Sequence, residues 1–287
     1  MYTVSNTLRT AINNNTPQRV LLEFRNRSFS NEDILVEEGV ELNEEFCGET
    51  DLTIGLTPSA EISFTMINED GQLRNFTFGK FTAWLGARID SGTPGNSAKT
   101  KTFTEGGSSK LYEFTPLGVF IADRPNVVTT KTIDIVANDQ MTLFDKDMPS
   151  DSALSVTYPI TLENLFKKLC TKAGVEYKSS NFLNKGISVQ KRPKVFDTAT
   201  MREVLGWIAE AACSIARFDR DGKLEMAWFK TVNKTFDEND YTEFSPYWYE
   251  TSAINGLNVR NSEKVVELNT GSGNNKYMIL DNPFLTD

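Results

Sequence analysis

The chain has 287 residues, of which 30 are Lys or Arg and 39 are Asp or Glu, so its formal net charge is −9; it contains no histidine. The missing histidine excludes Ser-His-Asp and Cys-His nucleophile systems, histidine-containing zinc sites and switches that depend on imidazole titration. The acidic balance disfavours tight nucleic-acid binding, because neutralising phosphates takes a basic surface. At ~150 residues per domain, the length predicts two or three domains.

Residues 1–149 have the pattern of strands and turns. Apolar Ile62, Phe64 and Met66 alternate with polar residues, and the turn-forming residues 68–71 follow. This period of two is typical of a half-buried strand, and it returns at residues 132–137. No helical period of useful length occurs before residue 141. We therefore expect an antiparallel barrel or sandwich in this region.

Residues 90–110 differ from the rest of this region because Phe103 is their single large aromatic side chain and they are otherwise mainly small and polar. Such a segment cannot bury enough apolar surface to offset the entropy of ordering it. We interpret it as a long exposed hairpin or loop. Residues 106–110 lack the Gly-Lys-Ser/Thr ending of a phosphate-binding loop.

Residues 150–230 predict two helices followed by a hairpin. Thr161 is the expected N-cap of the first helix, which carries an apolar stripe and ends at Gly174. Thr200 and Glu203 form a capping box that opens the second helix. Turn residues 219–222 then separate two short alternating segments. This order indicates an α+β domain.

Residues 231–287 return to strand-like segments. About 57 residues are few for an independent β domain, because small domains bury a small fraction of their surface. We therefore expect a partner chain, or a further C-terminal part, to complete the core of this last region.

Paired carboxylates are the remaining enzymatic option, because glycosidases use one acid and one base or nucleophile. Three pairs are candidates by proximity alone, and each is better explained as part of a solvated face: Glu37-Glu38, Glu44-Glu45 and Asp237-Glu238. Residues 219–222 resemble the start of a calcium loop, but they lack its third ligand position and terminal Glu, so a plain turn is expected. We predict no catalytic, cofactor-binding or metal-binding residue.

A run of aromatic residues in the last region has three interpretations. It could form core, anchor a protein interface, where Tyr and Trp are enriched, or stack on sugars. The interface candidates are Tyr241, Phe244, Tyr247, Trp248 and Tyr249.

The cysteines Cys47, Cys170 and Cys213 are odd in number and form no C-x-x-C pair. We expect buried free thiols in a reducing cytoplasm. The N-terminus has no apolar core of a signal peptide, and no stretch of ~18 apolar residues occurs. The expectation is a chain without membrane insertion.

The middle region resembles the hub proteins of bacteriophage tails, as found in Gram-positive phages, in prophages and in contractile injection systems. The resemblance is carried by Tyr158-Pro159-Ile160-Thr161-Leu162, by residues 170–175, and by the block from residue 204 to residue 229. Residues 51–66 and 118–141 of the first region are similar too. One departure is Ala212-Cys213, which stands where such proteins often carry Gly.

This resemblance implies a mostly β, α+β protein with two related antiparallel β-barrel hub domains, at residues 1–149 and 231–287, and an α+β domain at 150–230 between them. It implies a non-enzymatic virion structural protein, made in the bacterial cytoplasm, that forms a homotrimer at the tail tip or baseplate. The ring would join the hexameric tail tube, with its distal tail proteins, to a spike or fibre, and DNA would only pass through it during genome ejection. The alternative is a tail-associated cell-wall hydrolase or peptidoglycan-binding module.

Overall fold

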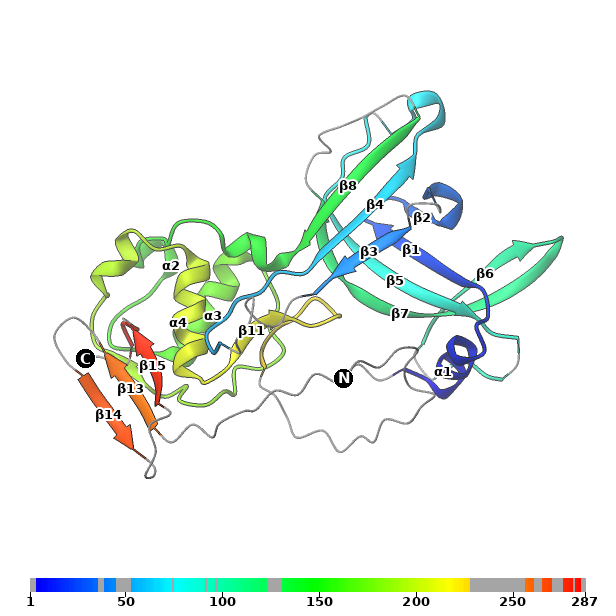
Figure 1. The fold of residues 1–287 in the computed structure, drawn as a ribbon. Helices are drawn as coiled ribbons and strands as arrows, with labels where there is room; N and C mark the ends of the chain where they lie inside the picture. The colour runs from blue at the N-terminus through cyan, green and yellow to red at the C-terminus, as the bar shows by residue number, and fades with distance from the viewer. Residues whose placement is uncertain are drawn as a thin grey trace.

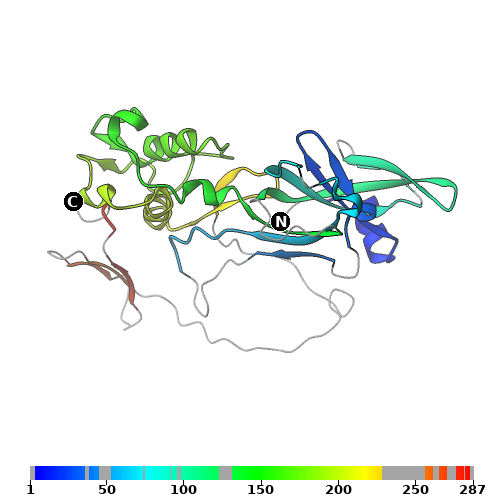
Figure 2. The same cartoon turned by 90° about the horizontal axis from the view of Figure 1, so that it is seen from above.

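The structure, a computed structural model, describes residues 4–35, 39–44, 53–73, 75–90, 92–95, 98–122, 131–227, 256–260, 265–269, 276–280 and 282–284. A unit built from one large sheet lies beside a unit that contains two long helices, as Figures 1 and 2 show. The predicted α+β architecture, with strands predominating, is confirmed.

The large sheet has eight antiparallel strands. Its hydrogen-bonded order is β2-β1-β5-β7-β8-β4-β3, and β6 pairs with β7 beside this path. The strands are β1 (Gln18–Phe24), β2 (Ser28–Ser30), β3 (Val40–Asn43), β4 (Glu61–Ile67), β5 (Lys80–Arg88), β6 (Lys99–Glu105), β7 (Ser108–Ala122) and β8 (Thr132–Asp139). The predicted alternation is present, since Ile62, Met66 and Ile133 are fully buried.

Over the residues that the structure describes, the sheet is open, in contrast to the antiparallel β-barrel expected for residues 1–149. Its end strand β2 has three residues, and the short 3-10 helix η1 (Asn31–Asp33) follows directly, so the chain leaves the ladder early. After η1, Ile34 forms one isolated bridge to Met66, and the Leu35 N–H donates to the Thr65 carbonyl at 2.8 Å. The sheet therefore curls without completing a cylinder.

An aromatic cluster fills the inside of this curl. The Phe24 ring stacks on Phe81 with centroids 4.6 Å apart, and it meets Phe29 edge-on at 5.7 Å. Edge-on and stacked pairs are the arrangements that aromatic quadrupoles favour. The cluster therefore holds β1, β2 and β5 together.

Helix α1 (Asn6–Asn13) was not expected from the sequence. Its N-cap Ser5 accepts a hydrogen bond from the Leu8 N–H at 2.9 Å, and Leu8 and Ala11 pack on Ala87 of β5. Two turns carry too few apolar positions for a helical period to stand out, and packing on the sheet stabilises the helix.

The second unit contains the two predicted helices, α3 (Leu162–Ala173) and α4 (Met201–Ala211), and the predicted hairpin, β11 (Ile215–Phe218) with β12 (Leu224–Ala227). The Thr161 cap of α3, its left-handed Gly174 and the Thr200–Glu203 capping box are all confirmed. The other elements are η2 (Glu69–Gly71) in the first unit, and η3 (Gln140–Phe144), α2 (Asp151–Leu154), β9 (Ile160–Thr161), β10 (Ser188–Val189) and η4 (Lys194–Asp197) in the second.

Helix α4 ends with Cys213 in the left-handed region, at φ 49°. The Cys213 N–H donates to the Glu210 carbonyl at 2.9 Å, and the Ser214 N–H donates to the Ala209 carbonyl at 2.8 Å. These two bonds form the Schellman ending that Gly usually supplies. The departure noted in the sequence therefore leaves the helix exit intact, with a non-glycine residue in a conformation that costs backbone energy.

The β11–β12 hairpin is extended on both sides by distant segments. On one side the Gly55 N–H donates to the Ser214 carbonyl at 2.8 Å, and the Ala216 N–H donates to the Leu56 carbonyl at 2.9 Å. On the other side the Leu224 N–H donates to the Glu176 carbonyl at 2.9 Å. A segment of the first region thus completes the sheet of the second unit.

Buried polar groups join the two units. The Gln140 side chain is 1% exposed; it accepts from Lys80 Nζ of β5 at 2.6 Å and donates to the Gly222 carbonyl at 2.7 Å. Beside it, Asp139 accepts from Ser59 Oγ at 2.8 Å and from the Met141 N–H at 2.9 Å. Burial raises the pKa of Asp139, and these donors oppose that rise. The satisfied polar groups fix how the units meet.

In the last region the structure describes three strands and the short segment 282–284. The strands are β13 (Gly256–Arg260), β14 (Val265–Asn269) and β15 (Lys276–Leu280); β13 pairs antiparallel with β14 and parallel with β15. The Asn282 amide then donates to the Trp207 carbonyl at 2.9 Å and to Glu210 at 2.7 Å. The chain therefore returns to α4 after these strands.

Candidate assembly interface

The five aromatic residues predicted as interface candidates fall outside the described residues. Their role stays a prediction: Tyr241, Phe244, Tyr247, Trp248 and Tyr249. Within the described residues, the candidate interface is the polar segment at residues 90–110.

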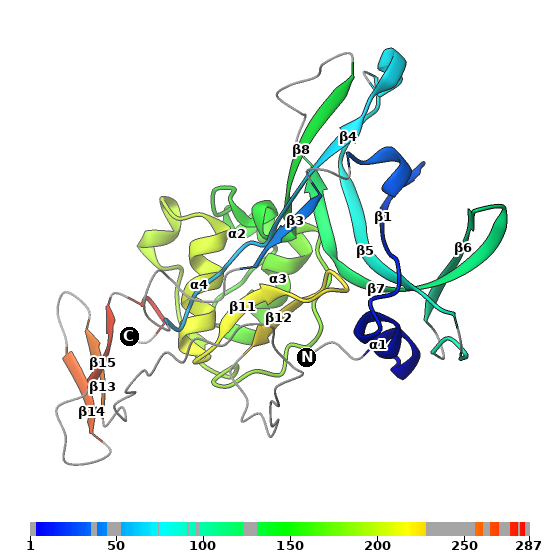
Figure 3. The ribbon, with the colours of Figure 1, turned by 45° about the vertical axis from the view of Figure 1, so that its right-hand side comes forward.

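That segment forms the predicted hairpin. Strand β6 pairs with the first part of β7, and Gly106 and Gly107 turn between them with φ values of 55° and 77°. Two successive positive φ values match the two-residue turn that suits the twist of hairpin strands. Figures 1 and 3 show the β6–β7 hairpin projecting beyond the rest of the sheet.

The inner face of the hairpin packs on the sheet. Phe103 meets Tyr112 edge-on with ring centroids 5.4 Å apart, and its centroid lies 6.3 Å from that of Phe114. Tyr112, Phe114 and Leu21 of β1 form a small second core. The one large aromatic side chain of the polar segment therefore anchors it, which the sequence pattern alone did not reveal.

Glu105, next to the turn, ties the hairpin to two other strands. It accepts from Arg19 of β1 through Nε at 3.1 Å and Nη2 at 3.0 Å, and from the Tyr112 hydroxyl at 2.5 Å. Arg88 of β5 approaches its other oxygen at 3.5 Å. The hydrogen bond from Tyr112 lowers the pKa of Glu105; burial opposes this and Arg19 adds to it. The guanidinium of Arg19 also covers the Phe103 ring at 4.4 Å.

We expect Glu105→Gln to lower the free energy of unfolding by about 1 kcal/mol at neutral pH, because it replaces charge-assisted hydrogen bonds at a partly exposed site. The pKa of Glu105 is lowered in the folded protein. Its stabilisation is therefore present above the ordinary carboxyl pKa, and it is lost as the pH falls through the lower folded value. Chemical denaturation from pH ~7 to ~3 should show the two proteins converging in acid.

The matched control is Glu176→Gln, whose carboxylate is exposed and lies 3.8 Å from Lys223. It should change stability by less than about 0.5 kcal/mol at any pH. Equal pH profiles for wild type and Glu105→Gln would show that Glu105 does not stabilise the hairpin.

A second polar site lies where α4 meets residues 54–57. The pocket has a volume of about 280 Å³ and is lined by Ile54, Gly55, Thr57, Arg202, Glu203, Gly206, Trp207 and Glu210. Burial raises the pKa of Glu210, while the hydrogen bond from Asn282 opposes that rise. Glu210 thus accepts a hydrogen bond from Asn282 and so attaches segment 282–284 to α4.

Among the described residues, none of the three candidate carboxylate pairs has both of its members. Glu44 lies 3.5 Å from Arg220 as half of a surface ion pair, whereas Glu37, Glu38, Glu45 and the Asp237-Glu238 pair lie outside the described residues. The predicted turn at residues 219–222 is confirmed: Asp219 accepts from the N–H groups of Asp221 and Lys223.

The two described cysteines, Cys170 and Cys213, are free thiols, and Cys170 is buried, as expected; Cys47 lies outside the described residues. Burial raises the pKa of Cys170 to about 12. Across the described ranges, no three acidic or Cys side chains gather as a metal site would require. None of the described helices has the length and apolar character needed to span a membrane.

Solved structures that are similar to this chain include three tail proteins. The 43 kDa tail protein of prophage MuSo2 from Shewanella oneidensis is 11% identical, with a TM-score of 0.48; the match covers 92% of this chain and 72% of that protein. Prophage tail protein gp18 from Listeria monocytogenes is 13% identical, with a TM-score of 0.47, over 93% of this chain and 73% of gp18. A tail protein from Neisseria meningitidis is 11% identical, with a TM-score of 0.43, over 92% of this chain and 70% of that protein. No family model and no curated protein matches. These identities and scores are too low to show a family.

Proposed function

We propose that this chain is a virion structural protein, the hub at the tail tip or baseplate of a phage or related injection machine. In this proposal it forms a homotrimeric ring, without enzymatic activity, between the hexameric tail tube and a spike or fibre. The ring encloses the channel through which DNA leaves. The distal tail proteins are its neighbours. Two β domains per subunit, the open sheet of residues 1–149 and the last region at 231–287, present a surface of near six-fold symmetry to the tube.

The single observation that carries the proposal is the open sheet with its projecting hairpin. Among the described strands of the large sheet, β2, β3 and β6 each pair on one side alone, and β2 has three residues. Free strand edges invite pairing with another chain, and a protein that functions as a monomer covers or blunts them. A neighbouring subunit would provide the strands that close the open barrel. The resemblance of residues 158–229 to tail hubs agrees with this, and in the structure those residues up to 227 belong to one packed unit.

The negative net charge of the chain favours a channel through which DNA passes over a surface that binds DNA. Three copies at −9 each carry a formal charge of −27. An acidic channel wall repels phosphate, so DNA would slide through without binding. The alternative is a cell-wall hydrolase or peptidoglycan-binding module. No carboxylate pair among the described residues favours it, and cleavage of purified cell walls would distinguish it.

Two measurements test the proposal. Analytical ultracentrifugation of the full chain over a range of concentrations should give a mass near three times 32.2 kDa. Antibody labelling of tail particles in the electron microscope should mark the tip. A chain that stays monomeric and labels no particle, or that cleaves purified cell walls, would overturn it.

A further inference from the structure

Two of the three strands that end the large sheet, β6 and β3, carry opposite charge. Strand β6 (Lys99–Glu105) and strand β3 (Val40–Asn43) each have one neighbour among the described strands, β7 and β4 respectively. A third end, β2, is shortened by η1 and followed by the bridge from Ile34 to Met66. Two strands are therefore available to extend the sheet.

The β6 edge is basic. Lys101 is exposed, and its ammonium lies 5.3 Å from the Phe103 ring. Lys99 of the same strand pairs with Glu23, whereas Lys101 forms no ion pair within the described part of the chain. Lys110 of β7 lies directly across from Phe103 in the ladder. Threonines 100, 102 and 104 are exposed between these charges, and threonine favours extended backbone. The edge thus offers backbone hydrogen bonds flanked by positive charge.

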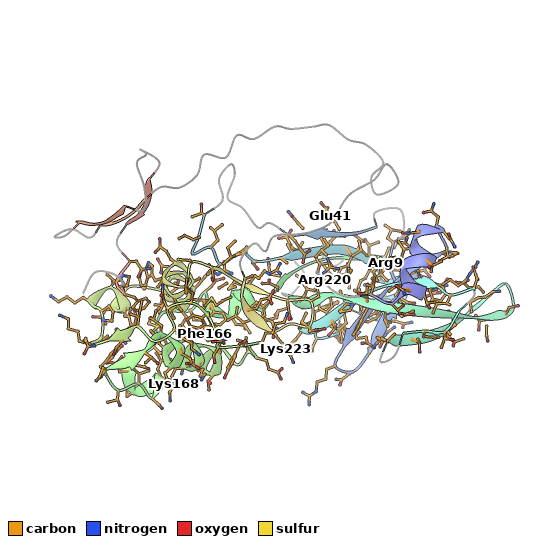
Figure 4. All side chains as sticks on the ribbon, turned by 90° about the horizontal axis from the view of Figure 1, so that it is seen from below. Arg9, Glu41, Phe166, Lys168, Arg220 and Lys223 are labelled. Atoms are coloured by element: carbon orange, nitrogen blue, oxygen red, sulfur yellow. The ribbon has the colours of Figure 1, made fainter. Side chains whose placement is uncertain are left out.

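The β3 edge is acidic. Its inward residues, Val40 and Leu42, pack on the aromatic core, so Glu41 points outward and is exposed. Glu61 of the adjoining β4 lies across from Asn43 and is exposed as well. Figure 4 places Glu41 on the rim of the molecule, away from Lys168 of α3. The edge offers the complementary charge.

We propose that β6 of one copy pairs with β3 of the next copy, with Lys101 beside Glu41 across the contact. This inference rests on the proposed ring and names the strands that close it. Two β6 edges would repel each other, as would two β3 edges, so charge selects the head-to-tail pairing. Figure 1 shows β3 beside β4, toward the unit with the helices, and the β6–β7 hairpin projecting away from β3 at the far right. A head-to-tail contact that repeats by rotation closes into a ring.

Charge reversal tests this pairing. Lys101→Glu and Glu41→Lys should each weaken self-association by about tenfold or more, because each places like charges side by side. The double variant, with both changes in one chain, should return to within about threefold of wild type, since every contact again joins opposite charges. Lys168→Glu is the matched control for net charge and should leave association unchanged. Circular dichroism checks that each variant is folded.

Cross-linking gives an independent readout. A carbodiimide joins a lysine amine to a carboxylate in contact with it, releasing water to the reagent and forming an amide bond. Applied to a mixture of 14N- and 15N-labelled chains, it should yield a peptide that joins Lys101 to Glu41 with mixed labels. A wild-type trimer that yields no such peptide, and that charge reversal does not weaken, would overturn the strand pairing while leaving the ring intact. A wild type that never self-associates would overturn both.

Discussion

Gly222→Ala should lower the free energy of unfolding by about 3 kcal/mol. Gly222 has φ 75°, where a residue with a Cβ costs about 1 kcal/mol. An added Cβ would also lie 2.6 Å from Val119 Cγ2 and 3.0 Å from Gln140 Nε2. Overpacking of this kind costs about 1–3 kcal/mol, because the branched valine on β7 cannot rotate away. Denaturant unfolding should show a lower midpoint.

The effect reaches beyond stability because Gly222 lies where the two units meet. Its carbonyl accepts the Gln140 hydrogen bond that also reaches Lys80 through the other end of the amide. A shift of this turn would leave a buried amide with a missing partner. The matched control is Gly107→Ala, at φ 77° with no atom within 4 Å of the added Cβ, which should cost about 1 kcal/mol. Equal losses in the two variants would show that the contact with Val119 is not tight.

Phe196→Ala should cost about 3–5 kcal/mol, the usual range for a fully buried aromatic residue. Phe196 lies on η4, is 0% exposed and stacks on Trp207 with ring planes 5° apart. Phe284 packs edge-on against it at 6.0 Å. Truncation would leave a cavity between η4, α4 and the returning segment 282–284, so that segment should lose its attachment. Chemical denaturation measures the loss.

The adjacent residue supplies the control. Val195 is 44% exposed, so Val195→Ala should change the free energy of unfolding by less than about 0.5 kcal/mol. A loss of that size in Phe196→Ala would mean that the aromatic stack on α4 does not hold the C-terminal segment.

Local sequence signals predicted the second unit well. Thr161, Gly174 and the pair Thr200–Glu203 mark helix ends because the groups that satisfy the terminal N–H and carbonyl groups lie within four residues of them. The same holds for the turn at residues 219–222, whose Asp219 side chain bonds its own backbone. Helix α1 escaped prediction because its two turns are stabilised by Ala87, far along the chain.

The candidate interface was predicted in outline only. The polar composition of residues 90–110 indicated an exposed hairpin, and residues 99–110 form one. Nothing in the composition indicated that Glu105 meets Arg19, 86 residues away in the chain. The one available hint was Phe103, an aromatic residue in an otherwise polar segment, which needs a surface to pack on.

By itself, the sequence determined the helices α3 and α4, the β11–β12 hairpin, the strand periods of the large sheet, the exposed hairpin within residues 90–110 and the chemistry excluded by the missing histidine. These depend on residues that are neighbours in the chain. The tertiary structure alone decided that the sheet stays open, that residues 54–56 join the β11–β12 hairpin, and that Gln140 links the units. Those outcomes depend on hydrogen bonds between groups that are far apart in the chain. Such bonds produce no periodic pattern in the sequence, so the sequence alone does not predict them.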